Sequence, residues 1–330
     1  MKGHLRWVFR DAQRPHRFWH RSYVINGMPK DGPTFQLDQQ CYPFLEICDF
    51  YDEFSDVDGA AFVKEMLASG AAEDVLGLIA SKRDASTGLF PTDETPGDDA
   101  VAYPYHFSSH VLLWYTLARL ASMLRKLSLN SDTMSADTIQ ALADGIRDAA
   151  LKHFVITESD GLNPQVATPC LAYLVDGTGQ RTVYHDANDI PTVYAGRWGF
   201  LETDLQMEAW KNTMKLSLHP DTNPLGYSSD TDAAFSGLGS VHSPGPWPLG
   251  YFQELLFSHI LSQDPDTKEE GHLLRASAAK RIVGGMQWDG TFGEALDVHG
   301  GQTTSKAWFS WPGSMIASAL IEEAGLLLDF

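Results

Sequence analysis

Apolar residues recur at helical spacing along most of the chain, in segments separated by loops rich in glycine, proline and aspartate. The segment SSHVLLWYTLARLASMLRKL, within residues 105–127, carries apolar side chains every three or four positions, which predicts a long helix. Ser135 is the expected N-cap of the next one. The same spacing predicts the other helices over residues 35–54, 60–83, 135–154, 192–198, 201–217, 247–262, 268–286 and 307–328.

Strand patterns are rare by comparison. The segment CLAYLVDGTGQRTVYHD, residues 170–186, predicts one β-hairpin around the turn at Asp176-Gly177. Residues 1–34 are basic and aromatic, with three proline breaks, and are expected to be irregular. Helix pairs joined by long loops without a strict repeat favour a mainly α, helical toroid, formed by residues 1–330 as a single domain with a small hairpin near 170–184.

Composition narrows the choice of partners. The chain has 330 residues, 24 basic against 43 acidic, and a formal net charge of −19. Such a charge repels phosphate backbones and anionic headgroups, so neither nucleic acid nor a membrane is an expected partner. We find no apolar run of about 20 residues and no signal-peptide pattern after Met1, and three cysteines form no disulfide framework. These features favour a cytoplasmic protein.

Two acidic loops carry the candidate chemistry. The segment YHDANDIP, residues 184–191, contains Asp186 and Asp189, and the segment WDGTFGEA, residues 288–295, contains Glu294. Cleavage of a glycoside requires one carboxylic acid and one carboxylate base, usually beside an aromatic surface for the sugar. The aspartates are also compatible with a simpler role in a turn and a helix cap. The main hypothesis is that Asp186 or Asp189 is the acid and Glu294 is the base.

Aromatic and amide side chains complete the candidate site. Indole rings stack on the C–H faces of sugars, whereas amides and carboxylates bind sugar hydroxyls. Packing in the core is the alternative role for the tryptophans, and a solvated helix face is the alternative for the polar pair. The candidate sugar-binding residues are Asp38, Gln39, Trp198, Trp247, Trp288, Trp308 and Trp311.

Other site classes lack their motifs. His106 and His110 have helical i, i+4 spacing, but no third ligand is near them in the sequence. The acidic loop over residues 93–99 lacks the spacing of a known calcium loop, and its composition predicts a solvated acidic lid. No Gly-x-Ser-x-Gly segment and no phosphate-binding glycine loop occurs. We therefore expect no metal site and no cofactor.

Three segments between residues 184 and 320 resemble motifs of a known family. The segment HDANDIP approximates a DDAN(V/I)P loop with one inserted residue, and GSVHSPGPWP is similar to a GSPHT…WP loop. Glu294 followed by Trp308-Phe309-Ser310-Trp311 resembles a glutamate followed by WFAW. These motifs resemble those of the six-hairpin, (α/α)6-barrel glycoside hydrolases, nearest to the family-125 exo-α-1,6-mannosidases.

The resemblance implies hydrolysis of a terminal α-mannoside by inversion, without a metal. It adds His185, Asn188 and His242 to the sugar-binding candidates. Because of the inserted residue, either Asp186 or Asp189 can match the acid of the family. The pattern predicts eight or nine helices where a closed six-hairpin barrel has twelve, which is consistent with an incomplete copy or a barrel with fewer hairpins.

The scaffold leaves other activities open. One alternative is a glucoamylase-like or trehalase-like hydrolase, or a lyase acting on uronic sugars. The other alternative is a truncated copy that binds carbohydrate without turnover. In each case a carbohydrate is the expected ligand.

Overall fold

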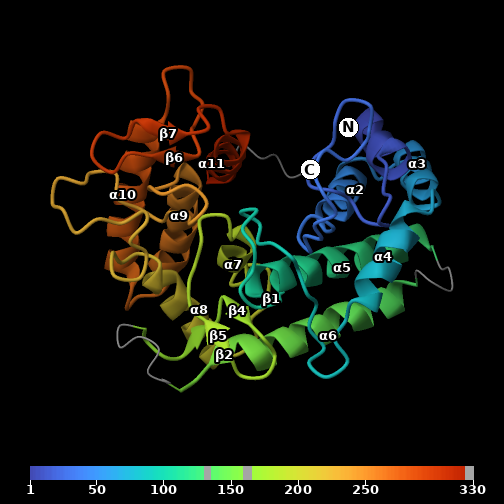
Figure 1. Ribbon diagram of the computed structural model, residues 1–330, viewed down its shortest axis with the longest axis horizontal. Helices are drawn as coiled ribbons and strands as arrows, with labels where there is room; N and C mark the ends of the chain where they lie inside the picture. The colour runs from blue at the N-terminus through green and yellow to red at the C-terminus, as the bar shows by residue number, and fades with distance from the viewer. Residues whose placement is uncertain (130–134, 159–165, 324–330) are drawn as a thin grey trace. The chain divides into compact units, whose positions relative to one another are not determined.

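A computed structural model describes residues 1–129, 135–158 and 166–323 (Figure 1). Contacts between residues divide the chain into two compact units. The first unit comprises Met1–Val155 and Ala172–Thr182, and the second comprises Ile156–Leu171 and Val183–Phe330. Organisation as a single domain stays a prediction.

The first unit is built mainly on helices. Its two longest, α5 (Phe107–Leu127) and α6 (Ala136–Phe154), lie side by side (Figure 1). The predicted cap of α6 is confirmed, because the Ser135 side chain accepts a hydrogen bond from the Thr138 backbone at 3.1 Å. The other helical elements of this unit are α1 (Lys2–Arg6), the π-helix η1 (Trp7–Asp11), α2 (Tyr42–Glu53), α3 (Val57–Leu67) and α4 (Ala71–Ser81).

Three predictions for this unit need correction. The helix predicted from residue 35 begins at Tyr42, because Pro43 lacks an N–H and fits only the first helical turn. The helix predicted over residues 60–83 is two helices, broken where Gly70 adopts a φ of +86°. The N-terminal segment is not wholly irregular, because Leu5, Val8 and Phe9 are buried at helical spacing in α1 and η1.

The predicted hairpin is confirmed and gains a third strand. In the hairpin, β4 (Leu174–Val175) pairs antiparallel with β5 (Arg181–Thr182), and β1 (Tyr105–His106) joins the other edge of β4. Asp176 fixes the turn by accepting hydrogen bonds from the backbone of residues 178–180. A separate pair is formed by β2 (Val155–Ile156) and β3 (Cys170–Leu171).

The second unit is built around α9 (Pro248–Gln263), which packs along α10 (Lys268–Gly285) and against α11 (Ser310–Glu323) (Figure 1). The core between them includes Phe252 and Leu255 of α9, Ile282 of α10 and Ile316 of α11. The remaining elements are α7 (Ile190–Tyr194), α8 (Asp204–Leu216), β6 (Ala295–Leu296) and β7 (Thr303–Ser305).

The pairing of β6 with β7 was not predicted from the sequence, because strands of two or three residues are too short to show an alternating pattern. The helix predicted over residues 192–198 begins earlier, at Ile190, and ends at Tyr194. The last helix begins at Ser310, and its predicted end over residues 324–328 lies outside the described residues.

The described part of the chain is mainly helical, as the sequence predicts, with strands of only two or three residues. Within this part, no helix is both long and apolar enough to cross a membrane.

Helix α9 approaches a neighbouring loop so closely that only glycine fits at one position. A Cβ atom added at Gly250 would lie 2.1 Å from the carbonyl oxygen of Leu238. We expect Gly250→Ala to lower the free energy of unfolding by about 3 kcal/mol, because the helix must move away from the loop. Urea denaturation followed by circular dichroism measures this change.

Gly77 in α4 provides the control, because the nearest atom to its added Cβ is Arg17 Nη2 at 3.8 Å. Gly77→Ala should stabilise the protein by about 0.5–1 kcal/mol through the higher helix propensity of alanine. Equal effects of the two substitutions would contradict the close approach at Gly250.

Candidate active site

The aspartate loop, residues 184–189, leads directly into α7 and is buried in the second unit. The Asp186 carboxylate, 3% exposed, accepts hydrogen bonds from the Tyr184 hydroxyl at 3.1 Å and from the Asn188 backbone at 2.9 Å. The Asn188 amide also donates to Asp186, at 2.8 Å, and to Ser240 Oγ, at 3.2 Å. The Asp186 backbone N–H donates to Asp189 Oδ2 at 3.3 Å, so the two aspartates lie against each other.

Two opposing influences set the protonation of Asp186. Burial is the larger, and the negative charge of Asp189 adds to it, because both disfavour a second charge in this loop. Hydrogen bonds from Asn188 and Ser240 favour the charged form and oppose the shift. The result is that the pKa of Asp186 is raised to about 6, which keeps a proton available in weakly acidic solution.

Glu294 lies just before β6 and is also almost fully buried, with 1% exposure. Its Oε2 accepts hydrogen bonds from Ser243 Oγ at 2.9 Å and from Ser305 Oγ at 2.6 Å. Its Oε1 pairs with Lys306 Nζ at 2.5 Å. The backbone N–H of Glu294 donates to the carbonyl oxygen of Ser305 at 2.9 Å, which fixes the carboxylate at the start of the β6–β7 pair.

The environment of Glu294 favours its charged form. Burial acts to raise its pKa, but the hydrogen bonds from Lys306, Ser305 and Ser243 together outweigh burial and lower it. A carboxylate has about four lone-pair positions, and these side chains occupy three of them in the described chain. One position on Oε1 therefore has no side-chain donor among the described residues and can accept a hydrogen bond from a small molecule.

One loop contacts both carboxylate sites. In the serine loop, residues 235–247, Ser240 bonds to Asn188 of the aspartate loop and Ser243 bonds to Glu294. Since extended chain covers at most about 3.6 Å per residue, the Cα atoms of Ser240 and Ser243 are no more than about 11 Å apart. The two acidic segments, more than a hundred residues apart in the sequence, therefore bind to neighbouring points of the same loop.

A buried glutamine fixes the other side of the aspartate loop. Gln253 on α9 donates to the carbonyl oxygen of Ala187 at 2.8 Å and to that of Asp186 at 3.2 Å. Its own oxygen lies 2.7 Å from His185 Nε2. His185 and Asn188, both predicted to bind sugar, thus hold the loop together in this structure.

The predicted aromatic residues lie in different environments. Trp247 is 1% exposed and packs in the core, and its indole N–H donates to the carbonyl oxygen of Ser243 at 2.8 Å. Trp311 is partly buried against the same core, and Trp198 stacks on Tyr194 with ring centroids 4.9 Å apart. Trp288 and Trp308 are 94% and 74% exposed. Only this last pair therefore offers widely open ring faces.

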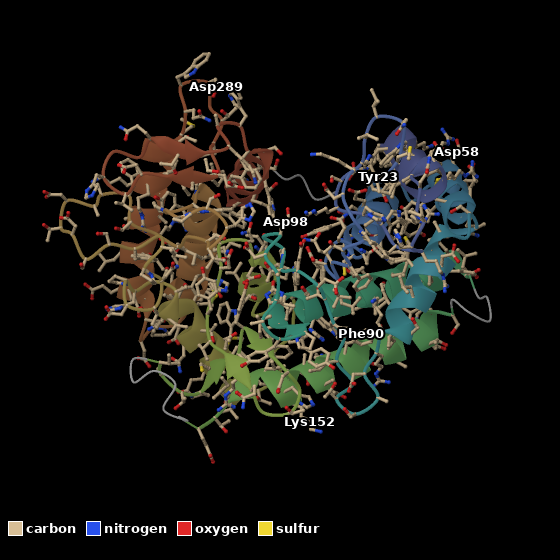
Figure 2. All side chains as sticks on the ribbon, in the orientation of Figure 1. Tyr23, Asp58, Phe90, Asp98, Lys152 and Asp289 are labelled. Carbon is tan, nitrogen blue, oxygen red and sulfur yellow. The ribbon has the colours of Figure 1, made fainter. Side chains whose placement is uncertain are left out.

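The two exposed tryptophans flank the segment that carries Glu294. Trp308 donates its indole N–H to Asp289 Oδ2 at 3.2 Å. Gln287 binds Thr291 and the carbonyl oxygen of Ala307, which ties the two flanking loops together. Figure 2 labels Asp289 in the loop that projects beyond β6 and β7.

The other predicted polar residues are placed as follows. His242 is half-buried in the serine loop, and its backbone N–H donates to Ser240 Oγ at 3.1 Å. Asp38 and Gln39 belong to the first unit, just before α2. Burial raises the pKa of Asp38 to about 7, although the nearby His106 opposes the shift.

Sequence reasoning did not select the side chains that hold the carboxylates. Ser240 and Ser243 lie inside the segment that carried the resemblance, but serines in a segment rich in glycine and proline are typical of turns. Ser305 ends a strand too short to be recognised, Lys306 follows that strand, and Gln253 lies beside mainly apolar residues in the first half of α9. Their roles depend on contacts that only the folded chain defines.

The fold is that of the six-hairpin glycosidases. The chain is similar to a solved structure described as a metal-independent alpha mannosidase of Streptococcus pneumoniae in a non-productive complex with α-1,6-mannobiose, with a TM-score of 0.72 and 20% identity. The match covers 97% of this chain and 78% of that one. It is also similar to cellobiose 2-epimerase from Spirochaeta thermophila, with a TM-score of 0.60, 11% identity and coverage of 98% and 78%.

The family can be stated more narrowly. Residues 69–321 match the metal-independent alpha-mannosidase family (GH125), and the chain belongs to that family. A curated relative, the meiotically up-regulated gene 157 protein of Schizosaccharomyces pombe, is 26% identical over 242 residues. That match covers 72% of this chain but 42% of the relative, so the chain spans less than half of that protein's length.

The raised pKa of Asp186 predicts a pH-dependent stability. Because the folded pKa of about 6 exceeds the usual value of 3.8, the favourable contribution is complete below pH 4 and is lost as pH rises through 6. Asparagine cannot ionise, so Asp186→Asn should gain stability relative to wild type across this range, by up to about 3 kcal/mol at neutral pH. Urea denaturation between pH 4 and pH 8 measures the difference.

Asp289→Asn is the control, because hydrogen bonds from Thr291 lower the pKa of this exposed aspartate. Its stability relative to wild type should not rise over the same range. A constant difference between Asp186→Asn and wild type at every pH would show that Asp186 ionises normally.

Proposed function

We propose that the chain hydrolyses a terminal α-mannoside with inversion, using Asp186 as the general acid and Glu294 as the general base. Membership of the GH125 family supports the reaction class and the sugar. The single observation that supports the two roles is the opposite direction of the pKa shifts in two buried carboxylates held by one loop. Such a divergence is typical of acid–base pairs in enzymes.

Asp186 suits the acid better than Asp189. An acid must keep its proton until the leaving oxygen needs it, and the pKa of Asp186 is raised to about 6. Asp189 then acts on its neighbour, because its negative charge contributes to this shift. The hydrogen bonds from Tyr184 and Asn188 hold the carboxyl group in one orientation.

Glu294 suits the base because its lowered pKa keeps it ionised while Asp186 is still protonated. The three donors hold both oxygens in place, and the remaining lone pair on Oε1 can take a proton from the attacking water. An inverting enzyme needs about 6.5–9.5 Å between its carboxyl groups to leave room for that water. The common attachment of both sites to the serine loop is compatible with such a spacing.

The sugar itself is proposed from the family. The Streptococcus pneumoniae protein is described with α-1,6-mannobiose bound, which makes an α-1,6-mannoside the first substrate to test. We propose that Trp288 and Trp308 offer ring faces to the sugar and that His242 binds its hydroxyls. A sugar-binding role for Asp38 and Gln39 of the first unit stays a prediction. A panel of aryl α-mannosides and α-glucosides separates this activity from the glucoamylase-like, lyase and inactive alternatives.

Removal of the base should abolish turnover. We expect Glu294→Gln to lower kcat by at least ~100-fold, because glutamine keeps the size of the side chain but cannot accept the proton of water. Binding of α-1,6-mannobiose, measured by calorimetry, should change little. In wild type, proton NMR should detect the β-anomer of mannose as the first product.

The matched control is Glu270→Gln, which removes an exposed carboxylate paired with Lys215 at 2.8 Å. This variant should keep wild-type kcat. Full activity of Glu294→Gln, or α-mannose as the first product, would remove Glu294 from the proposed role.

The proposed roles also fix the pH dependence of kcat/KM. Activity should rise with pH through the lowered pKa of Glu294, which must be ionised, and fall through about 6, where Asp186 loses its proton. Asp189→Asn removes the charge that helps to raise the pKa of Asp186, so the alkaline limb should move down by about one pH unit. Initial rates between pH 3.5 and 8 test this expectation.

The acidic limb should not move in Asp189→Asn, because Glu294 is held by other side chains. If only the acidic limb moved, the alkaline limb would report a group that Asp189 does not influence, and the proton donor would not be Asp186. An unchanged pH profile of kcat/KM would show that the charge of Asp189 does not affect the pKa of the acid.

A further inference from the structure

A buried ion pair joins two helices of the second unit beside the serine loop. Glu254 of α9 pairs with Arg281 of α10, and their side chains are 1% and 8% exposed. The second oxygen of Glu254 accepts hydrogen bonds from the Tyr227 hydroxyl at 2.9 Å and from the Leu238 backbone N–H at 3.1 Å. Burial and the charge of Glu254 raise the pKa of Tyr227, which keeps its hydroxyl a donor.

This cluster holds the first half of the serine loop at several points. Besides binding Leu238 through Glu254, it binds the carbonyl oxygen of Ser236 through Arg281. The Arg281 guanidinium also lies 5.0 Å from the ring centroid of Tyr251, whose hydroxyl donates to the carbonyl oxygen of Phe235. Three residues of the loop are thus bound within a stretch of four.

The second half of the loop is attached to the first. The carbonyl oxygen of Leu238 accepts a hydrogen bond from the Trp247 backbone at 3.0 Å, and the Trp247 indole N–H donates to the carbonyl oxygen of Ser243 at 2.8 Å. Gly239 accepts a hydrogen bond from the Ala187 backbone at 3.1 Å, which joins the loop to the aspartate loop. The positions of Ser240 and Ser243 therefore depend on where Leu238 is held.

Stability alone does not account for the ion pair. Leu255 of α9 and Ala278 and Ile282 of α10 already belong to one apolar core, so the helices can pack without it. Replacing a buried ion pair by apolar side chains of similar volume is often neutral or stabilising. The contacts that such a replacement cannot reproduce are those to the loop backbone.

We propose that Glu254, Arg281 and Tyr227 are positioning residues, which set the serine loop so that Ser240 and Ser243 hold the acid and the base. This role rests on the proposed function, because it acts through Asp186 and Glu294. The three residues are bonded to the loop and to one another rather than to the carboxyl groups of the acid and the base. Their removal should disturb the geometry of catalysis more than the binding of sugar.

The test begins with the loop itself, independently of activity. In Glu254→Met/Arg281→Met, exchange of the Trp247 indole proton with solvent, followed by NMR of nitrogen-labelled tryptophan, should become at least about 10-fold faster. The Trp210 indole is the internal control, because it is equally buried and donates to the carbonyl oxygen of Thr192 at 2.7 Å, away from the serine loop. Its exchange should not change, and Tm should stay within about 4 °C of wild type.

Kinetics on an aryl α-mannoside provide the second readout. The double variant should lose at least about 10-fold in kcat while KM changes little, because the loop orients catalytic groups rather than the sugar. Lys211→Met removes another ion pair of this unit, to Asp264 at 3.0 Å, and should keep wild-type kcat. If the double variant does not fold, Tyr227→Phe removes a single donor. It should then show faster exchange at Trp247 and a lower kcat, each by a smaller factor.

Unchanged exchange at Trp247 in a folded variant would overturn the proposal. Faster exchange with wild-type kcat would do so as well, because the loop would then be irrelevant to catalysis. A wild-type chain that hydrolyses no α-mannoside would instead remove the proposed function, and the exchange measurement would still decide whether the network holds the loop.

Discussion

Charge buried in the second unit must be satisfied by donors, and one loop supplies many of them. Asp186, Glu254 and Glu294 are each at most 3% exposed, and each interacts with a group of the serine loop. An unpaired buried carboxylate would cost several kcal/mol or would take up a proton. Because the serine loop interacts with all three carboxylates, a change in its conformation should change their protonation. A change in their protonation should in turn change the loop.

The fold alone does not define the activity. The chain shares its fold with an alpha mannosidase and with a cellobiose 2-epimerase, at sequence identities of 20% and 11%. Related scaffolds often support different reactions because the chemistry lies in the loops. In this chain, the family match and the buried acidic loops limit the range of reactions to consider, whereas the order of the helices does not.

The sequence predicted the helices well because their apolar spacing is strong, as in α5. It failed where a single backbone conformation decides the outcome, as at Gly70, or where strands are too short for any period, as in β6 and β7. The candidate site is less evident from the sequence than the helices are. Acidic loops can be recognised in a sequence. The sequence does not distinguish Trp247 from Trp288, because only the folded structure shows that the first ring is buried and the second is exposed.

Burial alone does not explain why Asp186 is proposed as the acid and Glu294 as the base. Asp186 and Glu294 are almost equally buried, yet the pKa of one is raised and that of the other is lowered. The difference is in the neighbours, because a negative charge from Asp189 adjoins the first and a positive charge from Lys306 adjoins the second. In the proposed roles, the acid lies beside a negative charge that adds to the effect of burial, whereas hydrogen bonds from Lys306, Ser305 and Ser243 outweigh burial and keep the base ionised.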